Sequence, residues 1–312
     1  GQRLFIKQPK SGSIFLTCGD RLLQDGDHVR SCTHPLYLHL TGHQETYSFD
    51  PNHPTGDWRL ETTYCGTVEN PAHWHTDEAG VVWDAKRGIF WKLAGTEYGP
   101  DDACLAAGTS VKAKVITLDP VSKTWTVPAG FSQERFGYCT NGVLDPQTDQ
   151  IIQIVDTAAK HLDLTTGQWT SYPLPTGAMR FNAWVTRIDR DLYWLDRNER
   201  LERYNLDSHR LTDLGVWPHG TIDGGWAMAM PFAVGGRLLT IWPTSGPGFP
   251  RLAATYETTA GRWEKIDQGD GWGNAGAVLR DGRVLLMGGG INGPQDRNPN
   301  IWIGTLARLP TP

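Results

Sequence analysis

The sequence predicts an all-β protein: a β-propeller of about six four-stranded blades, forming one domain over residues 1–312. Three observations predict this fold. A strand–turn–strand element recurs along the chain, and an aromatic element recurs in phase with it. The chain also has 36 Gly, 20 Pro and 14 Trp, a composition typical of many short strands joined by tight turns. No segment sustains the 3.6-residue periodicity of a helix.

The first repeat is a turn rich in Asp, Asn and Thr, followed by a bulky side chain that anchors the next strand. The copies are Asp119–Trp125, Asp163–Trp169, Tyr256–Trp263, a looser one at Asp50–Trp58 and a degenerate one at Asn205–Leu211. The polar side chains can bond the turn backbone, and Gly supplies positive φ where it is needed. The distance from Trp125 to Trp169 is 44 residues, which is typical of propeller blades of roughly 40–50 residues.

The second repeat is an aromatic residue followed by small residues, and it is expected to open the first strand of each blade. The copies contain Trp74, Phe136, Phe181, Trp226 and Trp272. The steps from Phe136 to Phe181, Phe181 to Trp226 and Trp226 to Trp272 are 45, 45 and 46 residues. Two repeats with one period indicate one supersecondary unit repeated around a ring.

One unit shows its four strands especially well. The predicted strands are Ala183–Asp189, Leu192–Asp196, Leu201–Leu206 and Leu211–Leu214, with turns at Asp189–Asp191 and Asp196–Asn198. Residues 9–65 supply one further unit. The last unit ends near Ile301–Leu306 and lacks a strand, which Arg3–Gln8 is expected to add. Pairing of the N- and C-terminal strands would close the ring and remove exposed edges. A seven-blade count of about 45 residues per blade is the alternative.

The C-terminal unit carries a family resemblance. Ala275–Gly290 contains a tight Asp281-Gly282 turn and a strand that closes on Gly288-Gly289, and it resembles a Kelch repeat. Arg135 and Arg180, each before an aromatic, resemble the basic residue that opens a Kelch inner strand. The resemblance covers most of the chain, although only the last unit has the di-glycine in that place. It implies a Kelch-like propeller.

The residues that open the inner strands are expected to ring one mouth of the central channel. They are His73, Trp74, His75, Arg135, Arg180, Trp226, Trp272 and Asn274. Such a polar and aromatic mouth could bind a peptide loop, a sugar or an anion. The alternative is structural: the aromatics pack between blades and the arginines bond neighbouring carbonyls.

Catalytic and metal signatures are weak. His73 and His75 would point to one face of a strand, but two ligands alone do not make a metal site. The Kelch resemblance raises the copper-radical oxidases. Tyr64-Cys65 and Tyr138-Cys139 are present, but the adjacent histidine pair of those enzymes is absent. Neither a catalytic residue, a metal nor a cofactor is therefore expected.

Two acids and the cysteines allow more than one interpretation. Asp156 and Asp196 end second strands, where they could be turn residues or could act as an acid or base beside the arginines. The five cysteines have no CxxC spacing, which argues against a zinc site of the usual kind. They are interpreted as buried thiols, or as a Cys18–Cys32 bridge in an exported protein.

Charge and hydropathy limit the partners. The net charge of −5, from 29 basic and 34 acidic residues, argues against nucleic acid. No run of 18 apolar residues occurs, so no membrane insertion is expected. A signal peptide is not visible in the given chain, and the compartment stays unknown.

Long connections are where partners usually dock on a rigid scaffold. Three are expected, at Gly95–Val111, Trp242–Arg251 and Asn292–Asn300. The sequence therefore favours a non-catalytic scaffold that binds a protein partner or the neighbours in a larger assembly, such as a phage virion or a bacterial surface complex. A glycan-binding propeller and a propeller enzyme (oxidase, epimerase or hydrolase) with a channel-mouth site are the alternatives.

Overall fold

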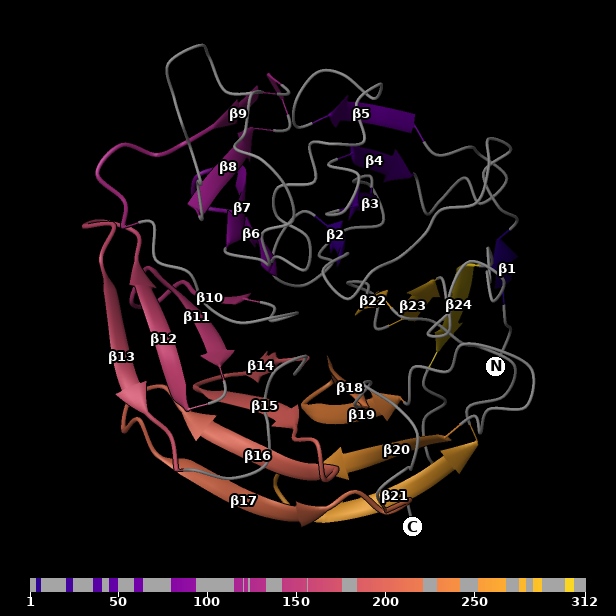
Figure 1. Ribbon diagram of the computed structural model, residues 1–312. Coiled ribbons are helices and arrows are strands. Elements are labelled where there is room, and N and C mark those ends of the chain that lie inside the picture. The colour runs from indigo at the N-terminus through magenta and orange to yellow at the C-terminus, as the bar shows by residue number, and fades with distance from the viewer. Residues whose placement is uncertain are drawn as a thin grey trace.

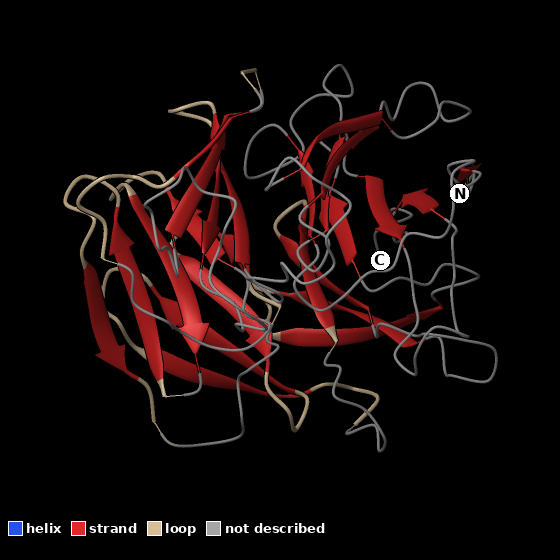
Figure 2. Cartoon of the chain, turned by 45° about the horizontal axis from the view of Figure 1, so that its top comes forward, coloured by secondary structure: helices blue, strands red, loops and turns tan. Residues whose placement is uncertain are grey.

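The structure is a computed structural model, and it describes seventeen stretches of the chain. These are residues 4–6, 21–24, 36–40, 45–49, 59–63, 80–93, 115–119, 121–122, 124–132, 142–155, 157–175, 184–220, 229–241, 252–267, 275–278, 283–287 and 301–305. Within these ranges the backbone forms strands, turns and loops and no helix (Figure 2). The prediction of an all-β protein is confirmed.

The strands pair with antiparallel neighbours into four-stranded sheets. In chain order they are β1 (Leu4–Ile6), β2 (Arg21–Gln24), β3 (Leu36–Leu40), β4 (Glu45–Phe49), β5 (Arg59–Thr63), β6 (Gly80–Asp84), β7 (Ile89–Leu93), β8 (Val115–Asp119), β9 (Thr124–Thr126), β10 (Gly142–Asp145), β11 (Gln150–Val155), β12 (Ala158–Asp163), β13 (Trp169–Pro173), β14 (Thr186–Ile188), β15 (Asp191–Leu195), β16 (Arg200–Asn205), β17 (Leu211–Val216), β18 (Met230–Val234), β19 (Arg237–Ile241), β20 (Leu252–Glu257), β21 (Arg262–Asp267), β22 (Ala275–Val278), β23 (Arg283–Met287) and β24 (Ile301–Thr305). Five sheets follow chain order, β2–β5, β6–β9, β10–β13, β14–β17 and β18–β21, and another has the order β1–β24–β23–β22.

The sheets succeed one another around a central axis, which makes the fold a β-propeller (Figure 1). The first strand of each chain-ordered sheet lies toward the centre, and the fourth lies on the rim. Four consecutive sheets, from β6 to β21, are described with most of their side chains, and they form four blades. In the sheet that contains both β1 and β24, Phe5 of β1 pairs with Trp302 of β24.

In the described part of the chain the hydrophobic core lies between neighbouring blades, because the blades from β10 to β21 are buried on both faces. Strand β15 shows why. Its side chains point alternately to opposite faces of the sheet, and residues 192–195 are all buried. Leu192 and Trp194 pack in a cluster with Ile152 of the preceding blade. Tyr193 and Leu195 pack in another cluster with Leu238 of the following blade.

The up-and-down order of the strands gives the propeller two different faces. Turns between first and second strands, and between third and fourth strands, lie at one edge of each blade, which we call the turn face. Connections between second and third strands, and the links from one blade to the next, lie at the opposite edge, which we call the loop face. Antiparallel neighbours in chain order require this separation.

The turn between third and fourth strands uses the same hydrogen bonds in three blades. Asp119, Asp163 and Asn205 each accept backbone N–H groups from the second and third residues that follow, at 2.7–3.2 Å. Gly167 (φ +73°) and His209 (φ +54°) then take a left-handed conformation. Their N–H groups donate to the carbonyls of Asp163 and Asn205 at 2.8 and 2.9 Å. The strand–turn–strand interpretation of the repeat is confirmed.

Candidate functional site

Polar side chains gather where neighbouring blades meet at the turn face. Arg87, in the β6–β7 turn, donates through Nη1 to Asp84 Oδ2 and to Asp149 Oδ1, both at 2.7 Å. Asp149 belongs to the β10–β11 turn of the next blade and also accepts from Lys86 Nζ at 2.7 Å. The hydrogen bond from Arg87 is the main reason that the pKa of Asp149 falls to about 2. These charges therefore hold two blades together.

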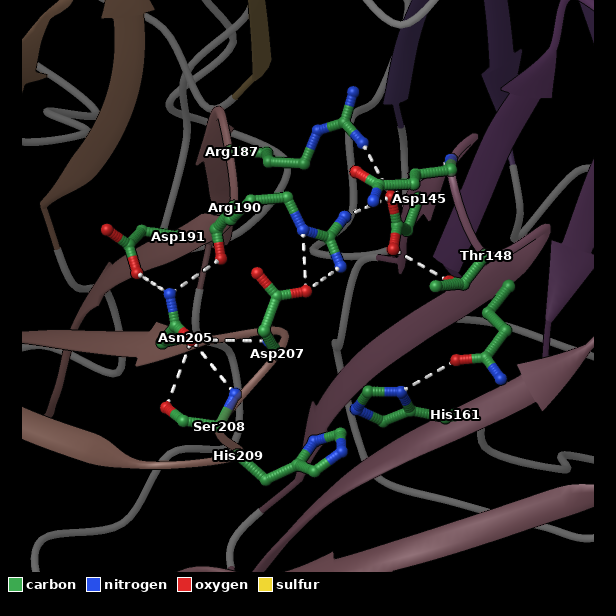
Figure 3. A network of polar contacts seen from close by, with 12 residues as sticks. Asp145, Thr148, His161, Arg187, Arg190, Asp191, Asn205, Asp207, Ser208 and His209 are labelled. Atoms are coloured by element: carbon green, nitrogen blue, oxygen red, sulfur yellow. Dashed lines mark hydrogen bonds and ion pairs between the residues drawn. The ribbon is translucent and has the colours of Figure 1, made fainter.

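A second ion-pair cluster lies at the next blade boundary (Figure 3). Arg190, in the β14–β15 turn, donates to Asp145 of β10 at 2.6 Å and to Asp207 at 2.8 and 3.0 Å. Arg187 Nη1 lies 3.4 Å from the same Asp145 carboxylate, whose side chain is only 2% exposed. Burial opposes ionisation of Asp145, but hydrogen bonds from Arg190 and Thr148 outweigh it and lower the pKa. Asp145 is therefore a charged, fully engaged group at neutral pH.

Two imidazoles and two phenols meet at the same boundary. His161 of β12 is buried, and its Nδ1 lies 3.1 Å from Gln150 Oε1. Tyr204 Oη of β16 lies 3.2 Å from His161 Nε2 and 2.9 Å from His209 Nδ1. The ring of Tyr172 stacks on His209 with the centroids 3.6 Å apart. Burial is the main cause that lowers the pKa of His161 to about 4, and it also lowers the pKa of His209.

Several contacts between blades come from residues with an unusual backbone. The non-glycine residues of the described chain with left-handed φ are Asp149, Asp189, Glu199 and His209. Asp149 and His209 occupy turn positions at which other blades have Gly88 and Gly167. A left-handed conformation costs a non-glycine residue about 1–2 kcal/mol. Asp149, Glu199 and His209 each contact a neighbouring blade, and these contacts hold a conformation that the residue alone disfavours.

At the loop face, Asp196 closes the hairpin between β15 and β16. Its Oδ1 accepts from the backbone N–H groups of Asn198 at 2.8 Å and Arg200 at 2.9 Å. Of the two interpretations of Asp196 from the sequence, the turn residue is confirmed. Asp156 lies outside the described residues.

Glu199, in the same hairpin, is a buried acid with 2% of its surface exposed. Its carbonyl accepts from Trp217 N at 2.7 Å, and its Oε2 lies 3.5 Å from Ala229 N, just before β18. Glu199 therefore joins both ends of the link between two blades, through its main chain at Trp217 and through its side chain at Ala229. Burial raises its pKa to about 8, and the charge of Asp196 adds to the effect. At neutral pH its carboxyl is protonated and can both donate and accept a hydrogen bond.

The residues predicted to form the channel mouth cannot be placed in this site. His73, Trp74, His75, Arg135, Arg180, Trp226, Trp272 and Asn274 lie outside the described residues, as do the five cysteines and the three expected long connections. Their roles stay predictions. The described strands nevertheless show where the long connections must begin and end, because β7, β19 and β23 all finish at the loop face.

The sequence did not point to the residues that the structure brings together at the blade boundaries. One signal was available for His209, which stands where the repeat has Gly167 and Gly261. For the contacts of Arg190 with Asp145 and of Glu199 with Ala229 no sequence signal exists, because the two residues of each contact come from different blades. Within the described ranges, His, Cys, Asp and Glu side chains form no cluster of three that could hold a metal ion. That part of the chain also contains no helix long and apolar enough to span a membrane.

Comparison with known proteins supports the fold alone. No family model and no curated relative matches the sequence. The chain is similar to a solved structure described as "Structure of YjhT", with a TM-score of 0.65 and 10% sequence identity. The similarity covers 97% of each chain. At this identity the likeness shows a propeller fold over almost the whole length and carries no information about ligands or activity.

Proposed function

We propose that this chain is a non-catalytic, Kelch-like propeller that binds a protein partner, or its neighbours in a larger assembly, through the loop face. The observation that carries the proposal is the contrast between the two faces in the blades from β6 to β21. At the turn face, connections are short and ion pairs join the blades. At the loop face, β7 and β8 are separated by residues 94–114, and β19 and β20 by residues 242–251.

The architecture proposed for the scaffold is a closed ring of six blades. The pairing of strands into six sheets supports the count. Pairing of β1 with β24 supports closure, because it gives the C-terminal sheet its fourth strand from the N-terminus. A ring closed in this way has no free edge between its ends. The Kelch-like assignment rests on the repeats of the sequence, above all on the C-terminal Ala275–Gly290 unit.

The engagement of Asp145 and Asp149 supports a structural role for these two acids over a catalytic one. Asp145 and Asp149 are paired with arginines that reach across blade boundaries, and their pKa values are lowered. A carboxylate held in this state is a poor general acid at neutral pH. The charged groups of the turn face therefore make the disc rigid, and a rigid disc presents its connections in a fixed arrangement.

Site-specific photo-cross-linking tests the proposal. A photo-reactive amino acid replaces Asn198, which is exposed at the loop face, and in a second variant replaces Thr165, which is exposed at the turn face. In cells that make the protein natively, we expect the Asn198 variant to form adducts of one defined mass, analysed by mass spectrometry. Few or no adducts are expected at Thr165. Equal adducts from both positions, or adducts at Thr165 alone, would contradict the proposal.

Glycan binding at the loop face is the second candidate, and it rests on the position of Trp226 in the link between β17 and β18. Binding on a glycan array that is lost in Trp226→Ala would favour this candidate over protein docking. A wild-type array without signal would remove it.

A further inference from the structure

We propose that His161, Tyr204 and His209 form an acid-sensitive junction, and that mild acid releases the β16–β17 turn from the neighbouring β10–β13 blade. The junction lies at the turn face, where the β10–β13 and β14–β17 blades meet. Figure 3 shows His161 and His209 approaching one another there from the two blades. The proposal does not depend on docking at the loop face, because it concerns only contacts between blades.

Hydrogen bonds fix the position of each proton in the junction. His161 Nδ1 lies 3.1 Å from Gln150 Oε1, which can only accept, so Nδ1 carries the proton and Nε2 has a free lone pair. Tyr204 Oη, 3.2 Å from His161 Nε2, donates to that lone pair. The same oxygen lies 2.9 Å from His209 Nδ1 and accepts its N–H. In the neutral junction every contact therefore has one donor and one acceptor.

The two imidazoles respond differently to an added proton. His209 is only partly buried, and it can take a proton on Nε2 while its Nδ1–H still donates to Tyr204. His161 is buried, and the lone pair that would take a proton is the one bound by Tyr204. A proton there gives the phenol two facing N–H donors, so its own hydrogen loses its acceptor. Protonation of His161 is thus the step that disrupts the closed junction.

Repulsion between like charges then separates the imidazoles. Two imidazolium rings would face each other with centroids 5.4 Å apart, and a site of low dielectric screens their charges poorly. His209 is the ring that leaves, because it is the less buried of the two. Its departure ends the stacking on Tyr172, where the centroids are 3.6 Å apart. Tyr204 can then accept from His161 Nε2–H and turn its own hydrogen toward solvent.

The backbone of His209 also favours release. Its φ of +54° lies in the left-handed region, and the equivalent turns have Gly167 and Gly261 at this position. This conformation is unfavourable for a residue with a Cβ, and it persists where other contacts hold it. The bond to Tyr204 and the stacking on Tyr172 are such contacts. Once they are lost, the turn can relax.

The pKa of His161 sets the pH range of the response. Burial is the main cause that lowers this pKa to about 4 from an ordinary 6.5, and the charge of His209 lowers it further, while Asp145 raises it. Burial also lowers the pKa of His209, and the charge of Asp207 opposes this effect. Between pH 6.5 and 4 the open form binds a proton that the closed form lacks. The closed form therefore loses stability as pH falls through this range.

The other charged groups at this boundary do not replace His161 as the group that responds. Burial raises the pKa of Tyr204, so the phenol stays neutral. The remaining titratable and charged groups that face the boundary are Asp145 of β10, Tyr172 of β13, Arg187 of β14, Arg190 of the β14–β15 turn, Glu202 of β16 and Asp207 of the β16–β17 turn. Asp145 and Asp207 both bind Arg190, and the pKa of Asp145 is lowered. The ion pair of Asp145 and Arg190 therefore stays charged while the turn is released.

Hydrogen–deuterium exchange of the full chain, analysed by mass spectrometry and corrected for the intrinsic effect of pH on exchange, tests the junction. Peptides from the β16–β17 turn are compared at pH 7, 6, 5 and 4.5 in the wild type, His161→Gln and His209→Gly. The control peptide comes from the β20–β21 turn, which has Gly261 at the equivalent position and no histidine. The control variant is His219→Gln, because the ring of His219 bonds the carbonyl of Ala253 outside the junction.

In the wild type we expect the protection of the β16–β17 turn to fall about tenfold for each pH unit between pH 6 and 4.5. The β20–β21 turn should show no such fall, and His219→Gln should respond as the wild type does. His161→Gln should lose the response, because glutamine can accept from Tyr204 and donate to Gln150 but does not titrate. His209→Gly should also lose it, because glycine suits the turn without the junction.

Two results would overturn the proposal. One is a wild-type β16–β17 turn whose protection does not change with pH, or changes only as much as that of the β20–β21 turn. The other is a wild-type response that persists in His161→Gln. If His161→Gln does not fold, His209→Gly decides in its place, and a wild-type response in that variant would equally exclude the junction.

Discussion

The turn face and the loop face are built from the same blades but use their polar residues in opposite ways. In the blades from β6 to β21, turns at the turn face contain five residues or fewer, and arginines bind carboxylates of the neighbouring blade. Connections at the loop face reach ten residues or more between β7 and β8 and between β19 and β20. The acid that stands out there, Glu199, is buried and protonated, while Asp145 at the turn face is buried and charged.

This difference shows how a propeller can hold its blades together at one face while the connections at the other face vary in length. Blades pack through apolar clusters on both of their faces, so each blade depends on its neighbours. Ion pairs at the turn face reinforce that packing at the edge of the blades. At the loop face the chain can lengthen without disturbing a strand, since loop length adds little to the free energy of folding.

The largest expected effect comes from the acid at the loop face. Burial raises the folded pKa of Glu199 to about 8, from an ordinary value of 4.5. Between these pH values the folded chain holds a proton that the unfolded chain releases. The free energy of unfolding should therefore fall as pH rises, by about 1.4 kcal/mol for each pH unit.

Glu199→Gln replaces the carboxyl with an amide that does not titrate, so this fall in the free energy of unfolding with rising pH should disappear. Near pH 8 the variant should therefore be more stable than the wild type. Urea unfolding of the variant and the wild type at pH 5, 6.5 and 8 measures the difference. If the stability profiles of the two proteins stay parallel over this range, the carboxyl is not protonated in the folded state.

The next largest effect is expected at the turn face. Asp145→Ala removes the carboxylate, only 2% exposed, that pairs with Arg190 and Arg187. Loss of one partner of a buried ion pair lowers the free energy of unfolding by about 3 kcal/mol. Asp207→Ala is the matched control, because Asp207 binds the same Arg190 but is 61% exposed, and it should cost less than about 1 kcal/mol. Urea unfolding at pH 7 measures both. Equal losses would mean that burial does not set the strength of these pairs.

A smaller effect is expected in the turns themselves. Gly167 has φ +73°, and a Cβ there would lie 2.8 Å from the Cα of Phe131, so Gly167→Ala should cost about 2 kcal/mol. Gly88 has φ +68° with open space around the same position, so Gly88→Ala should cost only about 1 kcal/mol. Thermal unfolding compares the two variants. Equal losses, or a larger loss at Gly88, would show that the contact with Phe131 adds no cost beyond the left-handed φ that both positions share.

Much of the fold was predictable because it is local and repeated. Asp163 begins a turn whose hydrogen bonds involve only residues close in sequence, so the same pattern at Asp119 and Asn205 predicted the same turn. The strands predicted around the Asp196 hairpin agree with β15 and β16 to within a residue. The predicted mouth residues, including Trp226 and Arg180, stay predictions because they lie outside the described residues.

The sites at the blade boundaries were not predictable, because their partners are far apart in sequence. Arg190 meets Asp145, 45 residues earlier, and His161 meets Tyr204, 43 residues later. A repeat period shows that two blades are neighbours, but it does not show which side chains of their turns come within bonding distance. A one-residue change in register would send each side chain to the opposite face of its strand.

The amino-acid sequence by itself determined the all-β class, the repeated unit and its turns, because turn chemistry and strand formation depend on residues close together in the chain. Only the tertiary structure decided that Asp145 is charged, that Glu199 is neutral and that His161 and His209 share one phenol oxygen. Burial and the choice of partner set these states, and both arise when separate blades pack together.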